Sequence, residues 1–249
     1  MSSTVPLILQ EDCEQGAKDL DDSIVNDFAY NNNVMQASKR VRMAFIRKVY
    51  GLLSVQLFFT VIVSSICMFT PPIKTFIQTN DWLLIVAMFG SIGILIALFI
   101  KRLETPTNFI LLAAFTVVEA YTVGVVVSFY SQAVVLQALI LTMVVVGCLT
   151  AYTFQTKHDY SSMYSSLFAG LCILLVGGFL QLFFHSTVFE LIFAIGGALL
   201  FSIFIVFDTQ MLMQTVSPEE YILATINLYL DIINLFLYIL RILQSLNQN

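Results

Sequence analysis

Long apolar runs, separated by short polar or charged breaks, occupy most of the chain from residue 49 onward. The runs cover 49–69, 82–100, 108–129, 133–154, 164–184, 188–207 and 221–243. About 20 apolar residues in a helix are enough to cross the hydrocarbon core of a bilayer. We therefore expect an all-α membrane protein, a bundle of six to seven transmembrane helices.

Composition extends this expectation to almost the whole chain. Of the 249 residues, 59% are hydrophobic and 11% are charged, whereas soluble domains carry about 25% charged residues. The polar residues 1–38 are the exception, and we expect an acidic, disordered cytosolic tail there, followed by a polytopic helical domain over 39–249. Outside this tail the charges nearly balance, so no basic surface for nucleic acid is expected.

Basic residues predict the orientation of the helices. Nine of the eleven Lys and Arg residues flank the runs on the side of the N-terminus, whereas Lys74 falls on the opposite side and Arg241 belongs to the last run. Because Lys and Arg accumulate on the cytoplasmic side of membranes, the N-terminus is predicted to be cytosolic. The last run can either span the membrane or dip in and return, and the sequence leaves this open.

Acidic residues inside membrane helices are candidates for function, because a carboxylate is costly in lipid. Glu119 lies in the middle of the third run, Asp208 directly follows the sixth, and Asp231 lies in the middle of the last. Glu190 stands near the start of the sixth run. For Glu119, a structural hydrogen bond to a neighbouring helix and a place on an ion path are both open.

The last run carries its polar residues on one face. They are separated by four, three, four and three positions, which places them in a single stripe along a helix: Asn227, Asp231, Asn234, Tyr238 and Arg241. Lipid offers no partner to such groups, so the stripe is expected to face protein or water and the helix to lie inside the bundle. The asparagines can be a structural seam between helices, but Asp231 calls for a further role.

Asp208 is the candidate partner of Asp231. The two can reach the same depth only if the sixth helix continues beyond residue 208, as Met211, Leu212 and Met213 suggest. Two carboxyl groups in a dry site share one proton and titrate as a pair. Such a pair would act as a latch. With the shared proton, the two carboxyl groups would be linked by a hydrogen bond; when both are ionised, they would repel each other or attract a cation between them. No dense ligand run for a tight Ca²⁺ site is present.

Three stretches resemble the transmembrane Bax inhibitor motif family, and within it the Lifeguard branch that includes the Golgi anti-apoptotic proteins. They are RMAFIRKVY at 42–50, FDTQ at 207–210 and SPEEYILATINLYLDIINLFLYILR at 217–241. The resemblance covers roughly residues 40–246. It implies a bundle whose last helix is central, in the membranes of the Golgi or endoplasmic reticulum.

The resemblance also implies a function. Members act as pH-sensitive Ca²⁺ leak channels or exchangers that lower store Ca²⁺ and restrain apoptosis, with Ca²⁺ as the transported ion and no cofactor. The family's proton-sensing pair corresponds to Asp208 and Asp231. Acids associated with the pore correspond to Glu190 and to Glu219 or Glu220, and the candidate ion path also includes Glu119, Asn227 and Asn234. Bacterial relatives carry a glutamate in the second helix, which here has no acid; Glu119 is its candidate substitute.

Two other functions compete with a channel. A non-conducting membrane protein could modulate Ca²⁺ channels or apoptosis regulators as its partners, without a pore. An intramembrane aspartyl protease would also need two aspartates on successive helices, but its GxGD motif is absent at Asp231, which follows Leu-Tyr-Leu. We therefore expect no enzyme. Ion selectivity, gate position, oligomeric state and any direct contact of Asp231 with the ion stay open.

Overall fold

The computed structural model describes residues 39–80, 82–156, 158, 160–181, 183 and 187–247. The expected acidic tail, residues 1–38, lies outside this part. Every regular element of the described chain is helical: α2 (Lys39–Phe69), α3 (Pro71–Thr79), α4 (Trp82–Ile100), α5 (Thr107–Ser128), α6 (Gln132–Gln155), η1 (Ser161–Met163), α7 (Tyr164–Gln181), α8 (Thr187–Gln214), η2 (Pro218–Glu220) and α9 (Tyr221–Asn247). The expected all-α class is confirmed.

Seven of the described helices are long and apolar enough to cross a membrane: α2, α4, α5, α6, α7, α8 and α9. Two of them exceed the predicted runs. α2 begins at Lys39, ten residues before the apolar run, because its first turns are polar but contain no helix breaker. α8 continues to Gln214 rather than ending at 207, since nothing in DTQMLMQ interrupts a helix. Asp208 is therefore inside α8 and not at its end.

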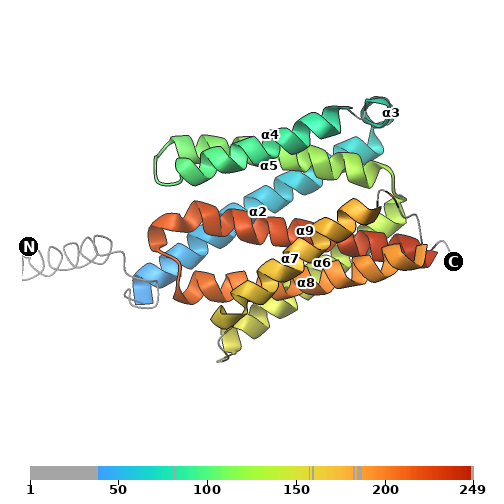
Figure 1. Cartoon of the computed structure of the whole chain (residues 1–249). Coiled ribbons are helices and arrows are strands. Elements are labelled where there is room, and N and C mark those ends of the chain that lie inside the picture. The colour runs from blue at the N-terminus through green and yellow to red at the C-terminus, as the bar shows by residue number, and fades with distance from the viewer. Residues whose placement is uncertain are drawn as a thin grey trace, which may run out of the picture.

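The last helix is the centre of the bundle. α9 runs between two groups of helices, α2–α4–α5 on one side and α6–α7–α8 on the other (Figure 1). It is the most buried of the seven candidate spans and packs against α8, α6, α2 and α5. It is also one unbroken helix of 27 residues, about 40 Å long, which favours a full crossing over a return within the membrane.

The loops that carry basic residues meet at one end of the bundle, here called the basic end. Arg102, in the α4–α5 connection, forms an ion pair of 3.1 Å with Glu220, just before α9. The ammonium group of Lys48 in α2 lies 3.3 Å from the ring centroid of Tyr221. At the opposite end, Arg241 of α9 donates a hydrogen bond to Gln181 at the end of α7. Opposite ends of α9 are thus anchored to different helices.

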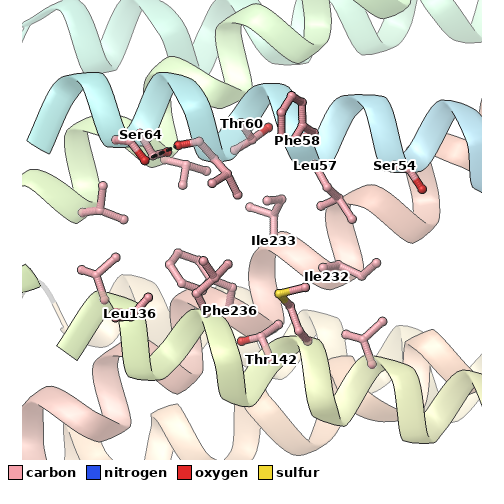
Figure 2. A pocket seen from close by; sticks show the side chains of 18 of the residues that line it. Ser54, Leu57, Phe58, Thr60, Ser64, Leu136, Thr142, Ile232, Ile233 and Phe236 are labelled. Carbon is pink, nitrogen blue, oxygen red and sulfur yellow. Dashed lines mark hydrogen bonds between the residues drawn. The ribbon is translucent and has the colours of Figure 1, made fainter. Parts of the chain in front are cut away.

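A lateral cleft separates α2 from α6 (Figure 2). Its volume is about 1060 Å³, and Ile232, Ile233 and Phe236 of α9 form its floor. Almost all of its lining is hydrocarbon, with scattered hydroxyl groups from Ser and Thr. The bundle is therefore not uniformly closed around α9.

Candidate functional site

Asp208 and Asp231 lie on α8 and α9, which pack together in antiparallel orientation. Their contacts occur at three successive levels: Glu190 with Arg241, Gly197 with Tyr238, and Asp208 with Asp231. This register exists because α8 continues beyond Asp208, which brings that carboxyl group to the depth of Asp231. The chain reversal between the two helices is made by η2, Pro218–Glu220.

The two carboxyl groups interact with one another. Each is within reach of the other as a hydrogen-bonding group, and Asp231 also experiences the charge of Asp208. Asp231 is 6% exposed, and its Oδ2 atom makes no hydrogen bond to any described residue. Two carboxyl groups so placed cannot both be ionised at low cost and share a proton. The buried Oδ2 atom thus has unused capacity to accept a hydrogen bond.

No basic residue compensates this pair within the described chain. The ion pairs that the described residues form are Lys101–Glu104, Arg102–Glu220 and Arg241–Glu190, and each involves residues at helix ends or in loops. Along α9, Asp231 lies eleven positions after Glu220 and ten before Arg241, about 16 Å along the axis from the ion pair at each end. No basic side chain of the described residues therefore serves as a fixed counterion for the pair.

Hydroxyl groups from three helices come together around Thr209, the residue after Asp208. The Tyr50 hydroxyl of α2 points toward the hydroxyl groups of Thr209 in α8 and Thr150 in α6. Thr209 is fully buried and directly follows Asp208. Tyr50 and Thr150 also line the lateral cleft, so this hydroxyl cluster lies at the edge of the cleft.

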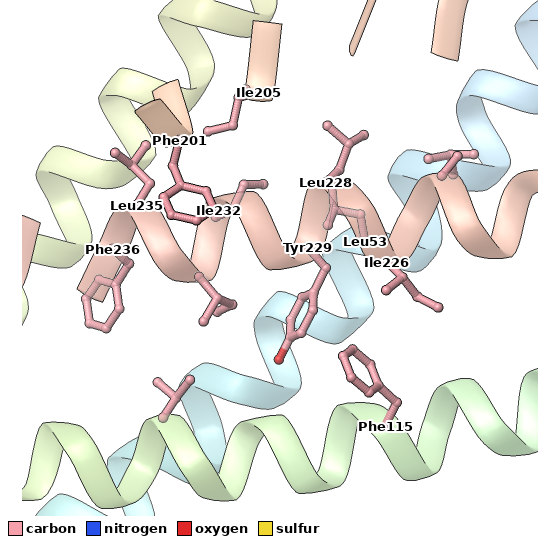
Figure 3. Packing of buried hydrophobic residues seen from close by; sticks show 14 of the residues in the cluster. Leu53, Phe115, Phe201, Ile205, Ile226, Leu228, Tyr229, Ile232, Leu235 and Phe236 are labelled. Carbon is pink, nitrogen blue, oxygen red and sulfur yellow. The ribbon is translucent and has the colours of Figure 1, made fainter. Parts of the chain in front are cut away.

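Glu119 belongs to a second polar cluster, on the other side of α9. Its carboxylate interacts with the Ser91 hydroxyl of α4 and lies near the Tyr229 hydroxyl. Tyr229 points away from α8, toward Phe115 of α5 (Figure 3), and its hydroxyl is 2.8 Å from Thr60 Oγ1 of α2. Glu119 is thus half-buried between α4, α5 and α9, and it does not join the aspartate pair.

The remaining candidate residues are spread over the length of the bundle. Glu220 is paired with Arg102 at the basic end, and Glu219 is exposed there. Glu190 is at the opposite end, 3.9 Å from Arg241. The structure therefore places acids near both ends of α9 and at its middle, but it does not gather them into one site.

The polar stripe of α9 is only partly interior, which corrects one expectation. Asn227 is exposed, because the stripe leaves the contact with α8 near the start of α9. Asn234 is half-buried, and its amide donates to the Leu230 carbonyl of its own helix. Among the described residues, no three His, Cys, Asp or Glu side chains gather to hold a metal ion.

Sequence reasoning missed several buried polar residues. Gln56 donates to Thr116 at 2.7 Å, and the Thr60 hydroxyl donates to the Gln56 carbonyl. The sequence did indicate a polar contact here, because Gln56 and Thr60 are one helical turn apart within an apolar run.

Gln210 was missed as well. Its side chain accepts a hydrogen bond from the Tyr160 amide and donates one to the His158 carbonyl, so it ties α8 to the α6–α7 connection. Tyr160 lies in the α6–α7 loop, and its hydroxyl oxygen is 2.8 Å from that of Tyr152. This hydrogen bond raises the pKa of the Tyr160 phenol. Gln210 lies two residues after Asp208, so the loop is anchored close to the carboxyl pair.

Comparison with known proteins adds the evolutionary context. The family described as "Inhibitor of apoptosis-promoting Bax1" matches residues 42–248. Mouse "Protein lifeguard 4" is 47% identical over 226 residues, covering 91% of this chain and 95% of the mouse protein. The "Golgi anti-apoptotic protein" of vaccinia virus (strain Lister) is 45% identical with the same coverage. "Bax inhibitor 1" of Schizosaccharomyces pombe is 38% identical, covering 90% of this chain and 85% of the yeast protein.

The match extends from the first turns of α2 to the end of α9, and it includes both aspartates and all seven candidate spans. The chain therefore belongs to the Bax inhibitor family, whose members include the Lifeguard and Golgi anti-apoptotic proteins.

Proposed function

We propose that this protein is a pH-sensitive, Ca²⁺-permeable leak channel of Golgi or endoplasmic reticulum membranes, which lowers store Ca²⁺ and thereby restrains apoptosis. The observation that carries the proposal is the contact between the carboxyl groups of Asp208 and Asp231 in the middle of the bundle. The proposal assigns these groups no catalytic role.

The physics of the pair supports a proton-operated latch. With one shared proton, the two carboxyl groups attract each other and hold α8 against α9. Without it, two negative charges face each other in a medium of low dielectric, where repulsion is strong. Separation of the helices, entry of a cation, or both would relieve that repulsion. Low pH is thus expected to close the path, and higher pH to open it.

Acids at both ends of α9 support a cation path through this level. Glu220 and Glu190 are each held by an arginine, Arg102 and Arg241, in pairs that are only partly buried. Such pairs are weak, so a passing Ca²⁺ could compete for the carboxylates. Asn227, Asn234, Glu219 and Glu119 are the further candidates along the way.

The cellular setting is inferred from relatives and from charge. One similar protein is named a Golgi anti-apoptotic protein, which supports a Golgi membrane and a role against apoptosis here. The basic residues at one end of the bundle support a cytosolic N-terminus. The Golgi and endoplasmic reticulum both enclose Ca²⁺ stores, so a leak through this protein would release Ca²⁺ to the cytosol.

Ca²⁺ flux into proteoliposomes that contain the purified full-length chain tests this proposal. Wild-type flux should increase with pH by up to about tenfold per unit across the titration of the pair, because one proton is released. In Asp231→Asn or Asp208→Asn only one carboxyl group remains, so two facing charges never form, and each variant should give low flux with a much weaker response to pH. Glu104→Gln removes an exposed loop carboxylate and should retain the wild-type profile.

Three outcomes would contradict the proposal: no flux at any pH, flux that decreases as pH increases, or an unchanged pH profile in both asparagine variants. Absence of flux together with intact protection of cells would favour the alternative, a non-conducting protein that acts on Ca²⁺ channels or apoptosis regulators.

A further inference from the structure

The lateral cleft opens toward the surroundings of the bundle, not toward its ends. Side chains at its rim are largely exposed: Phe58 of α2 is 69% exposed, and Leu136 and Met143 of α6 are 58% and 66% exposed. All three belong to candidate membrane spans. The cleft therefore faces the lipid phase in a membrane, and a bilayer component is the nearest available occupant.

The dimensions of the cleft fit a lipid chain. Its lining on α2 extends from Tyr50 to Phe69, about 28 Å along the axis, which is close to the thickness of the hydrocarbon core. The cleft volume of about 1060 Å³ lies just above the usual range of small-molecule sites, about 300–1000 Å³.

An exposed positive charge on α2 stands close to one end of the cleft. Arg47 precedes Ser54 by seven positions and Phe58 by eleven, so it shares the face of α2 that lines the cleft. Arg47 is exposed and makes none of the ion pairs found among the described residues. It lies just outside the apolar run that begins at residue 49, at the depth of lipid headgroups. The neighbouring Lys48 faces elsewhere, over the rings of Tyr221 and Phe109.

From this arrangement we propose that the cleft is a binding site for an anionic phospholipid of the surrounding bilayer. An acyl chain lies along α2 and α6 above Ile233 and Phe236, and the phosphate is held by Arg47 at the basic end. The inference does not depend on Ca²⁺ conduction. The predicted cytosolic position of that end agrees with it, since anionic lipids are concentrated in cytoplasmic leaflets.

Fluorescence quenching by brominated lipids tests the site in the full-length protein. The chain has a single tryptophan, Trp82, on α4, and replacing it with Phe gives a silent background. Phe58→Trp places a reporter in the cleft. Phe89→Trp, on the exposed face of α4 at a similar depth, is the matched control because Phe89 is 70% exposed and outside the cleft.

Each variant is reconstituted in vesicles of phosphatidylcholine and phosphatidylserine at one fixed ratio, with bromine on the chains of one lipid or the other. Per mole of brominated lipid, phosphatidylserine should quench the Phe58→Trp reporter about fivefold more effectively than phosphatidylcholine, the preference expected from one basic residue near the membrane. The Phe89→Trp reporter should show no preference. Arg47→Gln should abolish the preference at position 58, whereas Lys48→Gln should leave it unchanged.

Equal quenching by the two lipids at position 58 would overturn the proposal, and so would a preference that survives Arg47→Gln. Absence of quenching by either lipid would mean that protein covers the cleft, either a second copy or another transmembrane helix, and would also overturn it.

Discussion

At the scale of single residues, α9 presents different chemistry to its two sides. Asp231 meets Asp208 of α8, whereas Tyr229, two positions earlier, points toward α2 and α5 (Figure 3). Tyr229 is fully buried, and its ring meets the edge of the Phe115 ring. Residues two apart on a helix lie on nearly opposite faces. A central helix can therefore hold a carboxyl pair on one side and a separate polar cluster, with Tyr229, Thr60 and Glu119, on the other.

The hydrogen bond between Tyr229 and Thr60 should contribute measurable stability. The Thr60 hydroxyl donates to the Gln56 carbonyl, so the Tyr229 hydroxyl is the donor in their 2.8 Å contact. Tyr229→Phe should lower the free energy of unfolding by about 0.6 kcal/mol, the mean value for such bonds in membrane bundles. Unfolding in detergent by a denaturing surfactant provides the measurement.

A double-mutant cycle separates the bond from other effects of each substitution. Thr60→Val removes the other hydroxyl, and the double variant should cost less than the two single costs combined. Strict additivity would show that the two hydroxyl groups do not interact in the folded protein.

At the scale of elements, the contact between α8 and α9 depends on a glycine. A Cβ atom at Gly197 would lie 2.5 Å from the Tyr238 ring. That ring cannot easily move, because it stacks on Phe201 and meets Phe193 edge-on. Gly197 thus permits the close approach that also brings Asp208 to Asp231, eleven residues further along α8.

Gly197→Ala should therefore destabilise the bundle and disturb the carboxyl pair. Overpacking of a well-packed core costs about 1–3 kcal/mol, and the variant should unfold earlier in a thermal melt in detergent. Gly196→Ala is the matched control, since a Cβ atom there meets nothing within 4 Å. Equal melting temperatures for the two variants would show that the α8–α9 contact adapts freely.

At the scale of the whole molecule, the number of spans determines where the ends of the chain lie. If all seven candidate spans cross the membrane, the two ends of the helical domain are expected on opposite sides of it. Leu103, in the α4–α5 connection at the basic end, is 56% exposed, and Leu246, near the end of α9, is 58% exposed.

Labelling with a membrane-impermeant thiol reagent tests this topology. In a background without the native cysteines Cys13, Cys67, Cys148 and Cys172, Leu103→Cys and Leu246→Cys should react from opposite sides of sealed vesicles. Leu103→Cys is expected to react from the cytosolic side, because the basic end is predicted to be cytosolic. Labelling of both from one side would mean that α9 re-enters rather than spans.

Part of this architecture follows from sequence alone, because helix formation and membrane insertion are local. Each backbone hydrogen bond of a helix is made within four residues, and lipid contact requires only that a run be apolar. The runs at 82–100 and 133–154 therefore predict α4 and α6 almost to the residue. The stripe on the last run likewise predicted an interior helix, although the exposed Asn227 shows that a stripe does not specify how far it stays buried.

Tertiary structure decided which polar residues meet. The sequence offered Asp208 as a partner for Asp231 but could not place them at one depth, since this depends on the register of α8 against α9, with Gly197 under Tyr238. The sequence also could not show that Glu119 lies on the opposite side of α9 from the aspartate pair. Which helix covers which side of α9 depends on packing between segments that are far apart in the sequence. The lateral cleft has the same origin: it is the space that α2 and α6 leave over α9. Local chemistry thus determined seven apolar helices and their acids, and the packing of those helices determined which acids meet and where the bundle leaves a lateral cleft.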